Sequence, residues 1–270
     1  MKFSVITVNY NNKDGLQRTI ESVINQTFRD YEFIVIDGGS SDGSIDILNK
    51  YDEYITYWVS EPDGGIYQGM NKGIKKAKGE YLNFMNSGDC FFNENVLKNV
   101  ANYNCDADII TGRDYHYSEE KKLGHASIQP PRISMLTFFT STIDHQSSFI
   151  KHDLFIGSLY REDLRLVSDW VFFLEKLAIE GKKIHFIHDI VCYREIAGIT
   201  WRQYDQNLVE RENYLRQLLP IGVYQDYSTL INLDKESLFR LFALLDSPKA
   251  RKVLALCIKI IYNIKKHLKS

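Results

Sequence analysis

Polar side chains follow four apolar segments within the first ninety residues. Asn9, Asp37, Asp63 and Asp89 each stand in a short turn, and a glycine adjoins each of the three aspartates. Carboxylate oxygens accept hydrogen bonds from the N–H groups of a base, and they are ligands that Mg²⁺ and Mn²⁺ prefer. If the four segments are parallel strands, their turns meet at one edge of a sheet, where ligands bind. The pattern therefore predicts a site for a phosphate-containing ligand and a divalent metal ion.

The turn at 37–43 has the sequence D-G-G-S-S-D-G, and its two aspartates have different explanations. The glycines permit a tight turn, and Asp42 is well placed to cap the following helix. This structural explanation leaves Asp37 without a role, so we expect Asp37 to accept a hydrogen bond from the imide N–H of uracil. Two explanations of Asp63 are equally well supported: it caps the next helix, or it contacts a nucleotide ribose or a metal-bound water.

Asp89 ends the stretch Glu80–Asp89, which has the pattern of a buried strand that runs into a polar turn. The next helix is expected over Asn93–Ala101, which begins too late for Asp89 to cap it. Mg²⁺ and Mn²⁺ bind one or two carboxylates together with substrate phosphates. We therefore expect Asp89 to bind the metal ion, and Asn86 and Ser87 in the same turn to contact the substrate.

The composition disfavours several classes of protein. A net charge of -2 over 270 residues gives no indication of nucleic-acid binding. The glycine-rich turns match neither the G-x-G-x-x-G fingerprint nor a P-loop, which disfavours hydride-transfer and phosphate-loop enzymes. The 4 cysteines lack C-x-x-C spacing and are interpreted as reduced thiols of a cytosolic protein. The segment 1–8 lacks the apolar core of a secretory signal and is expected to begin the first strand.

The elements that position these turns alternate along the first hundred residues. Strands are expected over Phe3–Val8, Glu32–Ile36 and Tyr54–Val59, and amphipathic helices lie between them. This alternation predicts an α/β fold with a mostly parallel sheet and right-handed crossovers. Towards the carboxyl end, two short strands are expected over Ile184–Ile187 and Ile190–Tyr193.

Two stretches of the second half concern the chemistry. Ile143–Ile150 has the pattern of a strand entered through polar residues, and its His145 either faces the substrate or is a structural histidine. Trp170–Ile179 is apolar nearly all round and is expected to be a buried helix. Asp169 stands at the start of this helix, where an aspartate caps the first turn and interacts favourably with the helix dipole.

Four ordered segments resemble the family 2 glycosyltransferases. These segments are Phe3–Asn12, Asp37–Ser44, Asp63–Ile74 and Ser87–Asp89. The resemblance is close over the first hundred residues and looser over the next hundred. It implies a GT-A fold, with a Rossmann-like central sheet flanked by helices, and an inverting enzyme. Its donor would be a nucleotide-diphosphate sugar, usually a UDP-sugar, held by Mn²⁺ or Mg²⁺.

The resemblance also implies roles for individual residues. Asp37 would contact the base, Asp63 the nucleotide and Asp89 the metal. The triplet S-D-W at 168–170 is similar to the [ED]-D-[YW] motif of the family, so Asp169 would be the general base that takes the proton of the acceptor hydroxyl. The family often has D-x-D at the metal site, whereas Ser87 occupies its first position here and leaves Asp89 as the only acidic ligand of that turn.

We therefore expect residues 1–200 to form the glycosyltransferase domain, with a nucleotide-sugar-binding half at 1–110 and an acceptor half at 111–200. Residues 201–270 would form a helical extension. The acceptor would be a hydroxyl of a cell-surface glycan or a lipid-linked molecule. Ser87 and the poorly defined acceptor half leave a second class open, namely a catalytically silent nucleotide-sugar-binding or assembly module with the same fold.

The segment Lys249–Ser270 combines an apolar stripe with charges that are all basic. Lys259 interrupts the apolar run before it reaches the length of a membrane-spanning helix. Two alternatives remain. The segment binds an anionic membrane surface as an amphipathic helix, or it packs against the domain or against a second subunit of a homodimer. The first alternative predicts a cytoplasmic protein that is peripheral on the inner face of the cell membrane.

Overall fold

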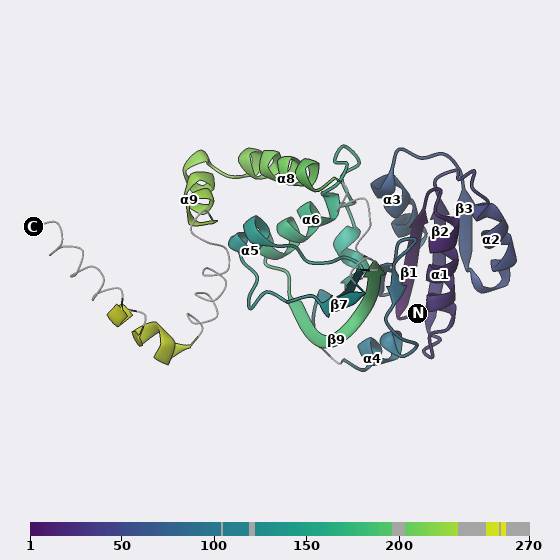
Figure 1. Ribbon diagram of the computed structural model, residues 1–270, viewed down its shortest axis with the longest axis horizontal. Coiled ribbons are helices and arrows are strands. Elements are labelled where there is room, and N and C mark those ends of the chain that lie inside the picture. Colours follow the sequence, from purple (N-terminus) through teal and green to yellow (C-terminus); the bar gives the residue numbers. More distant parts are fainter. Residues whose placement is uncertain (104, 119–121, 196–202, 232–246, 254, 258–270) are drawn as a thin grey trace, which may run out of the picture. The chain divides into compact units, whose positions relative to one another are not determined.

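The computed structural model describes residues 1–103, 105–118, 122–195, 203–231, 247–253 and 255–257 (Figure 1). The chain forms two compact units, which we describe separately. Unit 1 comprises Met1–Gln129 and Thr142–Tyr214, and unit 2 comprises Pro130–Ser141 and Leu215–Ser270. The expected division into donor and acceptor halves is functional, and it stays a prediction.

Strands and helices alternate in the first half of unit 1, as the sequence predicts. In chain order the elements of this half are β1 (Phe3–Asn9), α1 (Lys13–Ile24), β2 (Tyr31–Asp37), α2 (Ser44–Lys50), η1 (Asp52–Tyr54), β3 (Tyr57–Ser60), α3 (Ile66–Lys76), β4 (Tyr81–Phe84), β5 (Cys90–Phe91) and α4 (Val96–Asn102). The second half of the unit contains β6 (Ile109–Ser118), β7 (Leu123–Ala126), β8 (Ser148–Lys151), η2 (His152–Phe155), α6 (Ser168–Phe173), η3 (Leu174–Ile179), β9 (Ile184–Glu195) and most of α8 (Tyr204–Leu218).

The strands of unit 1 form one mixed sheet. Its order over the described residues is β3-β2-β1-β4-β8-β6-β9-β5, and β7 pairs with β6. Strands β3, β2, β1 and β4 are parallel, whereas β8 is antiparallel to both β4 and β6. The predicted α/β fold with a central sheet flanked by helices is therefore confirmed (Figure 1).

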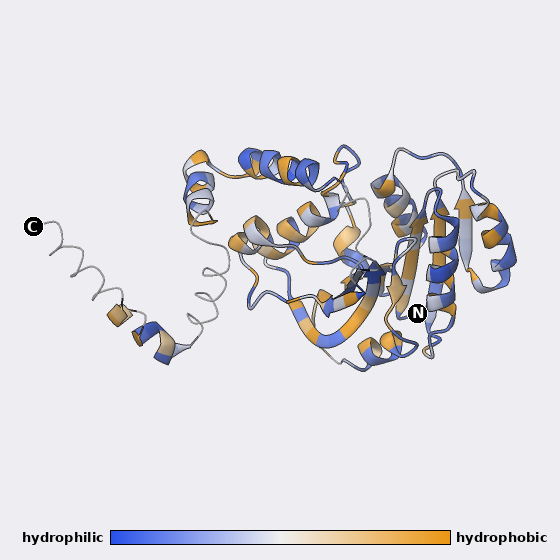
Figure 2. Cartoon of the chain, viewed as in Figure 1, coloured by the Kyte–Doolittle hydropathy of each residue, from blue (hydrophilic) through white to orange (hydrophobic). Residues whose placement is uncertain are grey.

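Helices cover both faces of the parallel strands. Phe3 and Val5 of β1 belong to the hydrophobic core that includes Leu16 of α1, whereas Ile6 and Val8 face α3. Successive side chains of a strand point to opposite faces, so a strand covered on both sides is hydrophobic along its whole length. Strands β1 and β2 are buried along almost their whole length, although they include the polar Ser4, Thr7 and Glu32, whereas α1 has one apolar and one polar face (Figure 2).

Three expected elements differ from the structure. The two short strands expected near the carboxyl end are one continuous strand, β9, because β6 pairs with it across register shifts between Thr111 and Asp114 that let both strands bend. The expected helix Trp170–Ile179 begins earlier, as α6, and continues as the π-helical turn η3. Strand β8 begins only at Ser148, so His145 lies in the loop before it.

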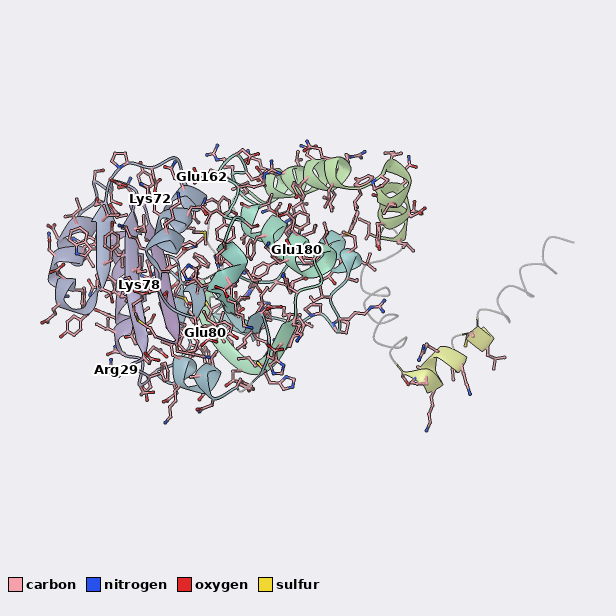
Figure 3. The ribbon with its side chains drawn as sticks, turned by 180° about the vertical axis from the view of Figure 1, so that it is seen from behind. Arg29, Lys72, Lys78, Glu80, Glu162 and Glu180 are labelled. Carbon is pink, nitrogen blue, oxygen red and sulfur yellow. The ribbon has the colours of Figure 1, made fainter. Side chains whose placement is uncertain are left out.

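Helix α3 is tied to the segment that precedes α6. The buried Asn71 side chain donates a hydrogen bond to the Tyr160 carbonyl (2.8 Å) and accepts one from the Tyr160 amide (3.0 Å). Glu162 accepts hydrogen bonds from Asn71 Nδ2 (2.9 Å) and Gln68 Nε2 (3.3 Å), and Lys72 stands on the same helix (Figure 3). These contacts hold the first turn of α3 beside the start of α6.

In the described part of unit 2, helices α5 and α9 make an aromatic contact. Helix α5 (Met135–Thr140) begins with a capping box formed by Ser134 and Thr137, and α9 spans Ile221–Ile231. The ring of Phe139 stacks on that of Tyr227 with centroids 5.0 Å apart. Residues 248–253 and 255–257 are helical, whereas residues 258–270 of the expected amphipathic tail lie outside the described residues.

Candidate active site

The carboxyl ends of β1, β2 and β3 lie side by side and carry polar residues. Asn9 is paired with Asp37, and Asp37 with Ser60, in the parallel register. The Asp37 carboxylate is fully buried and accepts hydrogen bonds from Asn9 Nδ2 (2.7 Å), Ser40 Oγ (2.6 Å) and Ser60 Oγ (2.6 Å). The structure therefore brings Asn9 and Asp37 together at the predicted edge of the sheet.

The charge of Asp37 is stabilised by the turn that follows it. Burial raises the pKa of Asp37, but hydrogen bonds from Ser40, Ser60 and Asn9 outweigh burial and hold this pKa below its ordinary value. The backbone amides of Gly39 and Ser40 donate two further hydrogen bonds. A carboxylate has about four lone-pair directions, so a base would have to displace one of these donors. The contact of Asp37 with a nucleotide base stays a prediction.

Asp63 lies against the same turn. Its carboxylate oxygens are 3.2 Å from the position that a Cβ atom on Gly38 would occupy, so the absence of a side chain there makes room for it. Asp63 Oδ1 accepts a hydrogen bond from the Gly65 amide (3.0 Å). Helix α3 begins after Gly65 without a side-chain cap, so the capping explanation of Asp63 is wrong. Its contact with a nucleotide stays a prediction.

The turn that contains Asn86, Ser87 and Asp89 follows β4 and is held by α1. Asn12 Nδ2 donates to the Ser87 carbonyl (2.9 Å), and Thr19 Oγ1 donates to the Asp89 carbonyl (2.7 Å). These bonds fix the backbone of the turn, so the Asp89 side chain projects from a rigid support.

Asp89 offers oxygen atoms to a cation. Its carboxylate is partly buried, and its Oδ2 atom accepts a hydrogen bond from Gln146 Nε2 (3.1 Å). Among the described residues, Asp89 Oδ1 has no hydrogen-bond donor, and neither does the buried Asn86 Oδ1 atom. Burial raises the pKa of Asp89, although Arg194 and His145 act in the opposite direction. Unpaired oxygens around a destabilised carboxylate fit a hard divalent cation such as Mg²⁺ or Mn²⁺.

Asp169 is held by residues from distant parts of the chain. The Tyr67 hydroxyl donates to Asp169 Oδ1 (2.7 Å), and His145 Nδ1 lies 2.8 Å from Asp169 Oδ2. In the described structure α6 begins after Val167 without a side-chain cap, so the capping explanation of Asp169 is wrong. Instead, the carboxylate lies beside the start of α3 and the loop before β8.

The environment keeps Asp169 ionised. Burial raises the pKa of this carboxyl, but the hydrogen bond and charge of His145, with the hydrogen bond from Tyr67, outweigh burial and lower the pKa to about 2. Such a group is a carboxylate throughout the neutral range. It is a weak base, so it can take a proton only as the hydroxyl becomes acidic during bond formation.

Asn86 and His145 connect the Asp89 turn with Asp169. The His145 Nε2 atom lies 3.3 Å from Asn86 Nδ2, while its Nδ1 atom faces Asp169. Strand β8 runs antiparallel to β4, so the residues before β8 lie beside the residues that follow β4. This arrangement brings the donor-side and acceptor-side residues of the prediction to one place.

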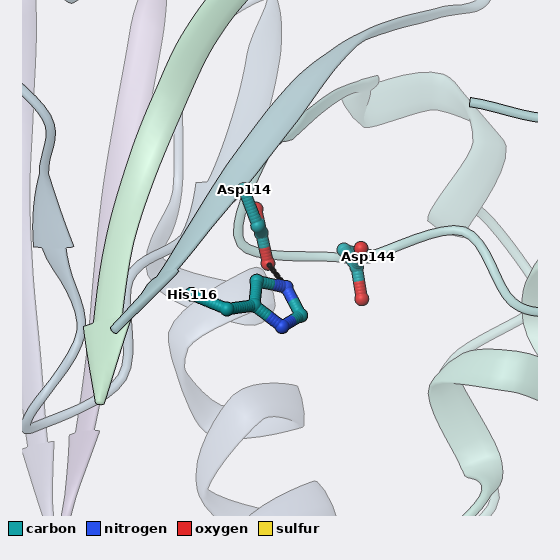
Figure 4. Close-up of side chains that lie close together, drawn as sticks. All are labelled: Asp114, His116 and Asp144. Atoms are coloured by element: carbon teal, nitrogen blue, oxygen red, sulfur yellow. Dashed lines mark ion pairs between the residues drawn. The ribbon is translucent and has the colours of Figure 1, made fainter. Parts of the chain in front are cut away.

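A second acidic group lies close by, formed by Asp114, His116 and Asp144 (Figure 4). Their potential ligand atoms all lie within 4.8 Å of one another. Arg194 already supplies a positive charge there, because its Nε atom is 3.2 Å from Asp114 Oδ2 and its Nη2 atom is 3.3 Å from Asp144 Oδ1. A metal ion in this group would have to displace the guanidinium. We therefore infer that the ion pairs of Arg194 hold the loop before β8, which carries Asp144.

Several residues of the site were not predicted from the sequence. Tyr67 and Gln146 touch the two predicted functional carboxylates, and Arg194 lies close enough to stabilise the charge of Asp89. Tyr67 lies inside the D-G-G-I-Y segment, and Gln146 directly follows His145. Their proximity to segments already singled out was the available signal.

The site lies within a chain that matches a known family of enzymes. The model of "Glycosyl transferase family 2" matches residues 4–163. An uncharacterized glycosyltransferase of Mycobacterium tuberculosis is 35% identical over 207 residues, which cover 73% of this chain and 76% of the relative. A PGL/p-HBAD biosynthesis glycosyltransferase of the same species is 27% identical over 218 residues, and the match covers 77% of this chain and 83% of the relative.

Solved structures show the same fold at low sequence identity. S. aureus TarS 1-349 in complex with UDP-GlcNAc has a TM-score of 0.66 and 20% identity, and the match covers 84% of this chain and 70% of that TarS fragment. The mannosyltransferase PcManGT from Pyrobaculum calidifontis, in complex with GDP-Man and Mn²⁺, has a TM-score of 0.64 and 14% identity, with coverages of 96% and 80%. The chain therefore belongs to glycosyl transferase family 2, and it is a glycosyltransferase with the GT-A fold.

Proposed function

We propose that this glycosyltransferase moves a sugar from a UDP-sugar to a hydroxyl of a cell-surface glycan or a lipid-linked acceptor, with inversion at the anomeric carbon. The observation that carries the proposal is the convergence of Asp89 and Asp169 on one loop, through Gln146 and His145. A metal-binding carboxylate and a general base are the two groups that such a transfer requires. TarS binds UDP-GlcNAc in its structure, and PcManGT binds GDP-Man and Mn²⁺, which supports a nucleotide-sugar donor and a divalent metal here.

On the donor side, Asp89 would hold the metal ion, and Asn86 and Ser87 would contact the diphosphate. When bound, Mn²⁺ or Mg²⁺ would offset the negative charge that develops on the leaving diphosphate. Asn9, Asp37 and Asp63 would bind the nucleoside at the ends of the first three strands. The rigid support of the Asp89 turn by α1 would keep its oxygen atoms in place during the reaction.

On the acceptor side, Asp169 would take the proton of the attacking hydroxyl. As that oxygen forms its bond to the anomeric carbon, the bond from this carbon to the diphosphate oxygen breaks on the opposite face, and the diphosphate leaves with the electron pair. The configuration at the anomeric carbon is therefore inverted. The low pKa of Asp169 keeps it ready to accept the proton at neutral pH.

The test compares the parent enzyme with Asp169→Asn, which keeps the size of the side chain and removes its basicity. Screening nucleotide sugars for thermal stabilisation with Mn²⁺ present first identifies the donor. We expect transfer to fall by about a hundredfold or more in Asp169→Asn, while UDP affinity is retained. The exposed Asp163→Asn serves as the matched control.

Two results would contradict the proposal. Transfer by Asp169→Asn within a few-fold of the parent would remove Asp169 as the base. Absence of both transfer and slow metal-dependent UDP-sugar hydrolysis in the parent would favour the alternative, a silent nucleotide-sugar-binding module.

A further inference from the structure

Three consecutive side chains in the loop before β8 reach three different parts of the site. Asp144 Oδ1 pairs with Arg194 Nη2 (3.3 Å), His145 contacts Asp169 and Gln146 Nε2 donates to Asp89 Oδ2 (3.1 Å). The residues of this segment therefore link Arg194, the candidate base Asp169 and the candidate metal ligand Asp89.

The backbone of this segment is fixed by hydrogen bonds of its own. Ser148 Oγ donates to the Asp144 carbonyl (2.7 Å), and the Ser148 amide donates to the His145 carbonyl (3.2 Å). Asn83 Nδ2, on β4, donates to the Gln146 carbonyl (2.9 Å). A loop held at three successive carbonyls can place a side chain with the precision that catalysis requires.

The hydrogen-bond directions around His145 follow from its neighbours. An ionised carboxylate only accepts hydrogen bonds, so His145 Nδ1, 2.8 Å from Asp169 Oδ2, is the donor of that contact, while Nε2 faces the Asn86 amide at 3.3 Å. The Nδ1–H group then donates to Asp169 Oδ2, while the Tyr67 hydroxyl donates to Oδ1. Each oxygen of the carboxylate receives one protein donor and keeps a lone pair for the acceptor hydroxyl.

We propose that His145 is a positioning residue that orients the Asp169 carboxylate towards the acceptor hydroxyl and ties it to the turn that carries Asp89. His145 is 12% exposed and Asp169 17%, so water competes little for this contact. Without the Nδ1 donor, Tyr67 would be the one hydrogen-bond donor left to the carboxylate among the described residues, and the carboxylate could turn away from the reacting oxygen. This inference rests on the proposed function of Asp169 as the base.

Two substitutions at position 145 separate the two contacts of the ring. His145→Asn places an amide nitrogen near the position of Nδ1, so it keeps a donor to Asp169 and loses the contact with Asn86. His145→Gln extends its amide towards the position of Nε2, so it keeps the contact with Asn86 and loses the donor to Asp169. His188→Gln, on the exposed part of β9, is the matched control.

The measurements are kcat and KM for transfer and the affinity for UDP with Mn²⁺ present. We expect His145→Gln and His145→Ala to lose roughly 100-fold in kcat, since a displacement of about 1 Å costs this much. For His145→Gln, which keeps the contact with Asn86, donor KM and UDP affinity should stay within about twofold of the parent. His145→Asn should recover most of the lost kcat.

The outcomes distinguish this inference from the function on which it rests. Full activity of Asp169→Asn would contradict the proposed base itself. If Asp169→Asn is inactive but all three His145 variants match the parent, only the positioning role is overturned. Equal losses in the Asn and Gln variants would also overturn it, because the donor to Asp169 would then have no special effect. A selective loss of UDP affinity would overturn it by assigning His145 to the donor site.

Discussion

Three aspartates of this site have the same side chain but different surroundings. Asp37 is saturated with hydrogen bonds, Asp89 is partly buried with an oxygen that no described donor contacts, and Asp169 is flanked by Tyr67 and His145. Burial raises the pKa of Asp89, whereas hydrogen bonds lower the pKa of Asp37 and bring that of Asp169 to about 2. Separation of the pKa values of like groups by their surroundings is how one site divides its roles.

At Asp89 we predict that UDP binding requires the metal ion. A diphosphate that approaches an acidic turn without a cation is repelled. With Mn²⁺ present, Asp89→Ala should bind UDP at least about tenfold more weakly than the parent, and EDTA should weaken the parent to a similar degree. Isothermal calorimetry measures both effects, with the exposed Asp226→Ala on α9 as control. Equal UDP affinities of Asp89→Ala and the parent in Mn²⁺ would rule out the metal assignment.

At Asp169 we predict a pH-dependent contribution to stability. The pKa of its carboxyl falls from an ordinary value of 3.8 to about 2 on folding, so the unfolded chain binds this proton first as the pH decreases. The stabilisation is therefore complete above about pH 4 and is lost as the pH falls through 2, and it amounts to about 2 kcal/mol.

Urea unfolding of the parent and of Asp169→Asn at several pH values measures this contribution. The difference in unfolding free energy between the two proteins should shrink by about 2 kcal/mol between pH 5 and pH 2. Asp226→Asn should show no comparable change relative to the parent. A difference for Asp169→Asn that stays constant with pH would contradict the stabilised carboxylate.

Among the elements, α3 packs directly on β1 through two glycines. A Cβ atom on Gly73 would lie 2.5 Å from Ile6 Cγ2, and one on Gly69 would lie 2.7 Å from Val8 Cγ1. Both strand residues are β-branched and buried, so their side chains have little freedom to move. Glycine at these two positions lets the first turn of α3 bring Tyr67 to Asp169.

We predict that Gly73→Ala destabilises the enzyme even though alanine favours a helix. The propensity gain is about 1 kcal/mol, whereas overpacking against Ile6 costs roughly 1–3 kcal/mol. Urea unfolding should therefore show a net loss for Gly73→Ala. Gly222→Ala in α9 is the control, because no described atom lies within 4 Å of its added Cβ, and it should be neutral or slightly stabilising. A Gly73→Ala protein as stable as the parent would show that the helix can move away without cost.

The order of the strands explains why residues of the second half reach the first. Strand β8 lies next to β4 and runs in the opposite direction, with Leu82 paired with Ile150. The chain that enters β8 therefore passes the end of β4, and His145 and Gln146 meet the Asp89 turn there. A parallel strand at this position would have placed the same loop at the opposite edge.

For the molecule as a whole, the carboxyl-terminal segment bears on whether the enzyme binds to membranes. In the described part of the chain, no helix has both the length and the apolar content to cross a membrane. Val253 is 62% exposed and lies with Lys249, Arg251 and Lys252 in the helical residues 248–253, and Leu256, in the helical residues 255–257, is 59% exposed. Apolar and basic side chains together favour binding to the surface of an anionic membrane.

We predict that residues 249–270 attach the enzyme to anionic lipid. Each Lys or Arg near such a surface contributes about 1 kcal/mol, so binding should require anionic lipid and weaken in salt. Co-sedimentation with anionic vesicles, run on the full chain and on a truncation that ends at Ser247, measures this effect. Only the full chain should sediment at low salt.

Two results would contradict membrane attachment. If both proteins stay in the supernatant at low salt, the tail has no affinity for the membrane. If the truncation instead unfolds or changes its oligomeric state, the tail packs on the enzyme itself or on a second subunit. Vesicles of neutral lipid serve as the control, because they remove the electrostatic attraction and keep the apolar surface.

The alternating strands and helices of the first half can be predicted from local sequence, as can the placement of Asn9 and Asp37 at the ends of strands and of Asp89 in the turn after β4. Hydrophobic period and turn residues act over a few neighbours, so they can be recognised locally. The same local signals explain the errors: they split β9 into two strands, because the pairing with β6 that makes it continuous involves distant residues.

The residues that surround Asp169 come together only in the folded chain. Tyr67 is 102 positions away from it and His145 is 24, and no local pattern specifies that they meet. From sequence alone, Asp169 could be either a helix cap or a catalytic base. In the folded chain it makes no capping hydrogen bond, so the capping explanation is excluded. The physical reason is that the antiparallel pairing of β8 with β4 and the packing of α3 on β1 join segments far apart in the sequence. Both contacts are driven by the burial of apolar surface, which no short stretch of sequence specifies.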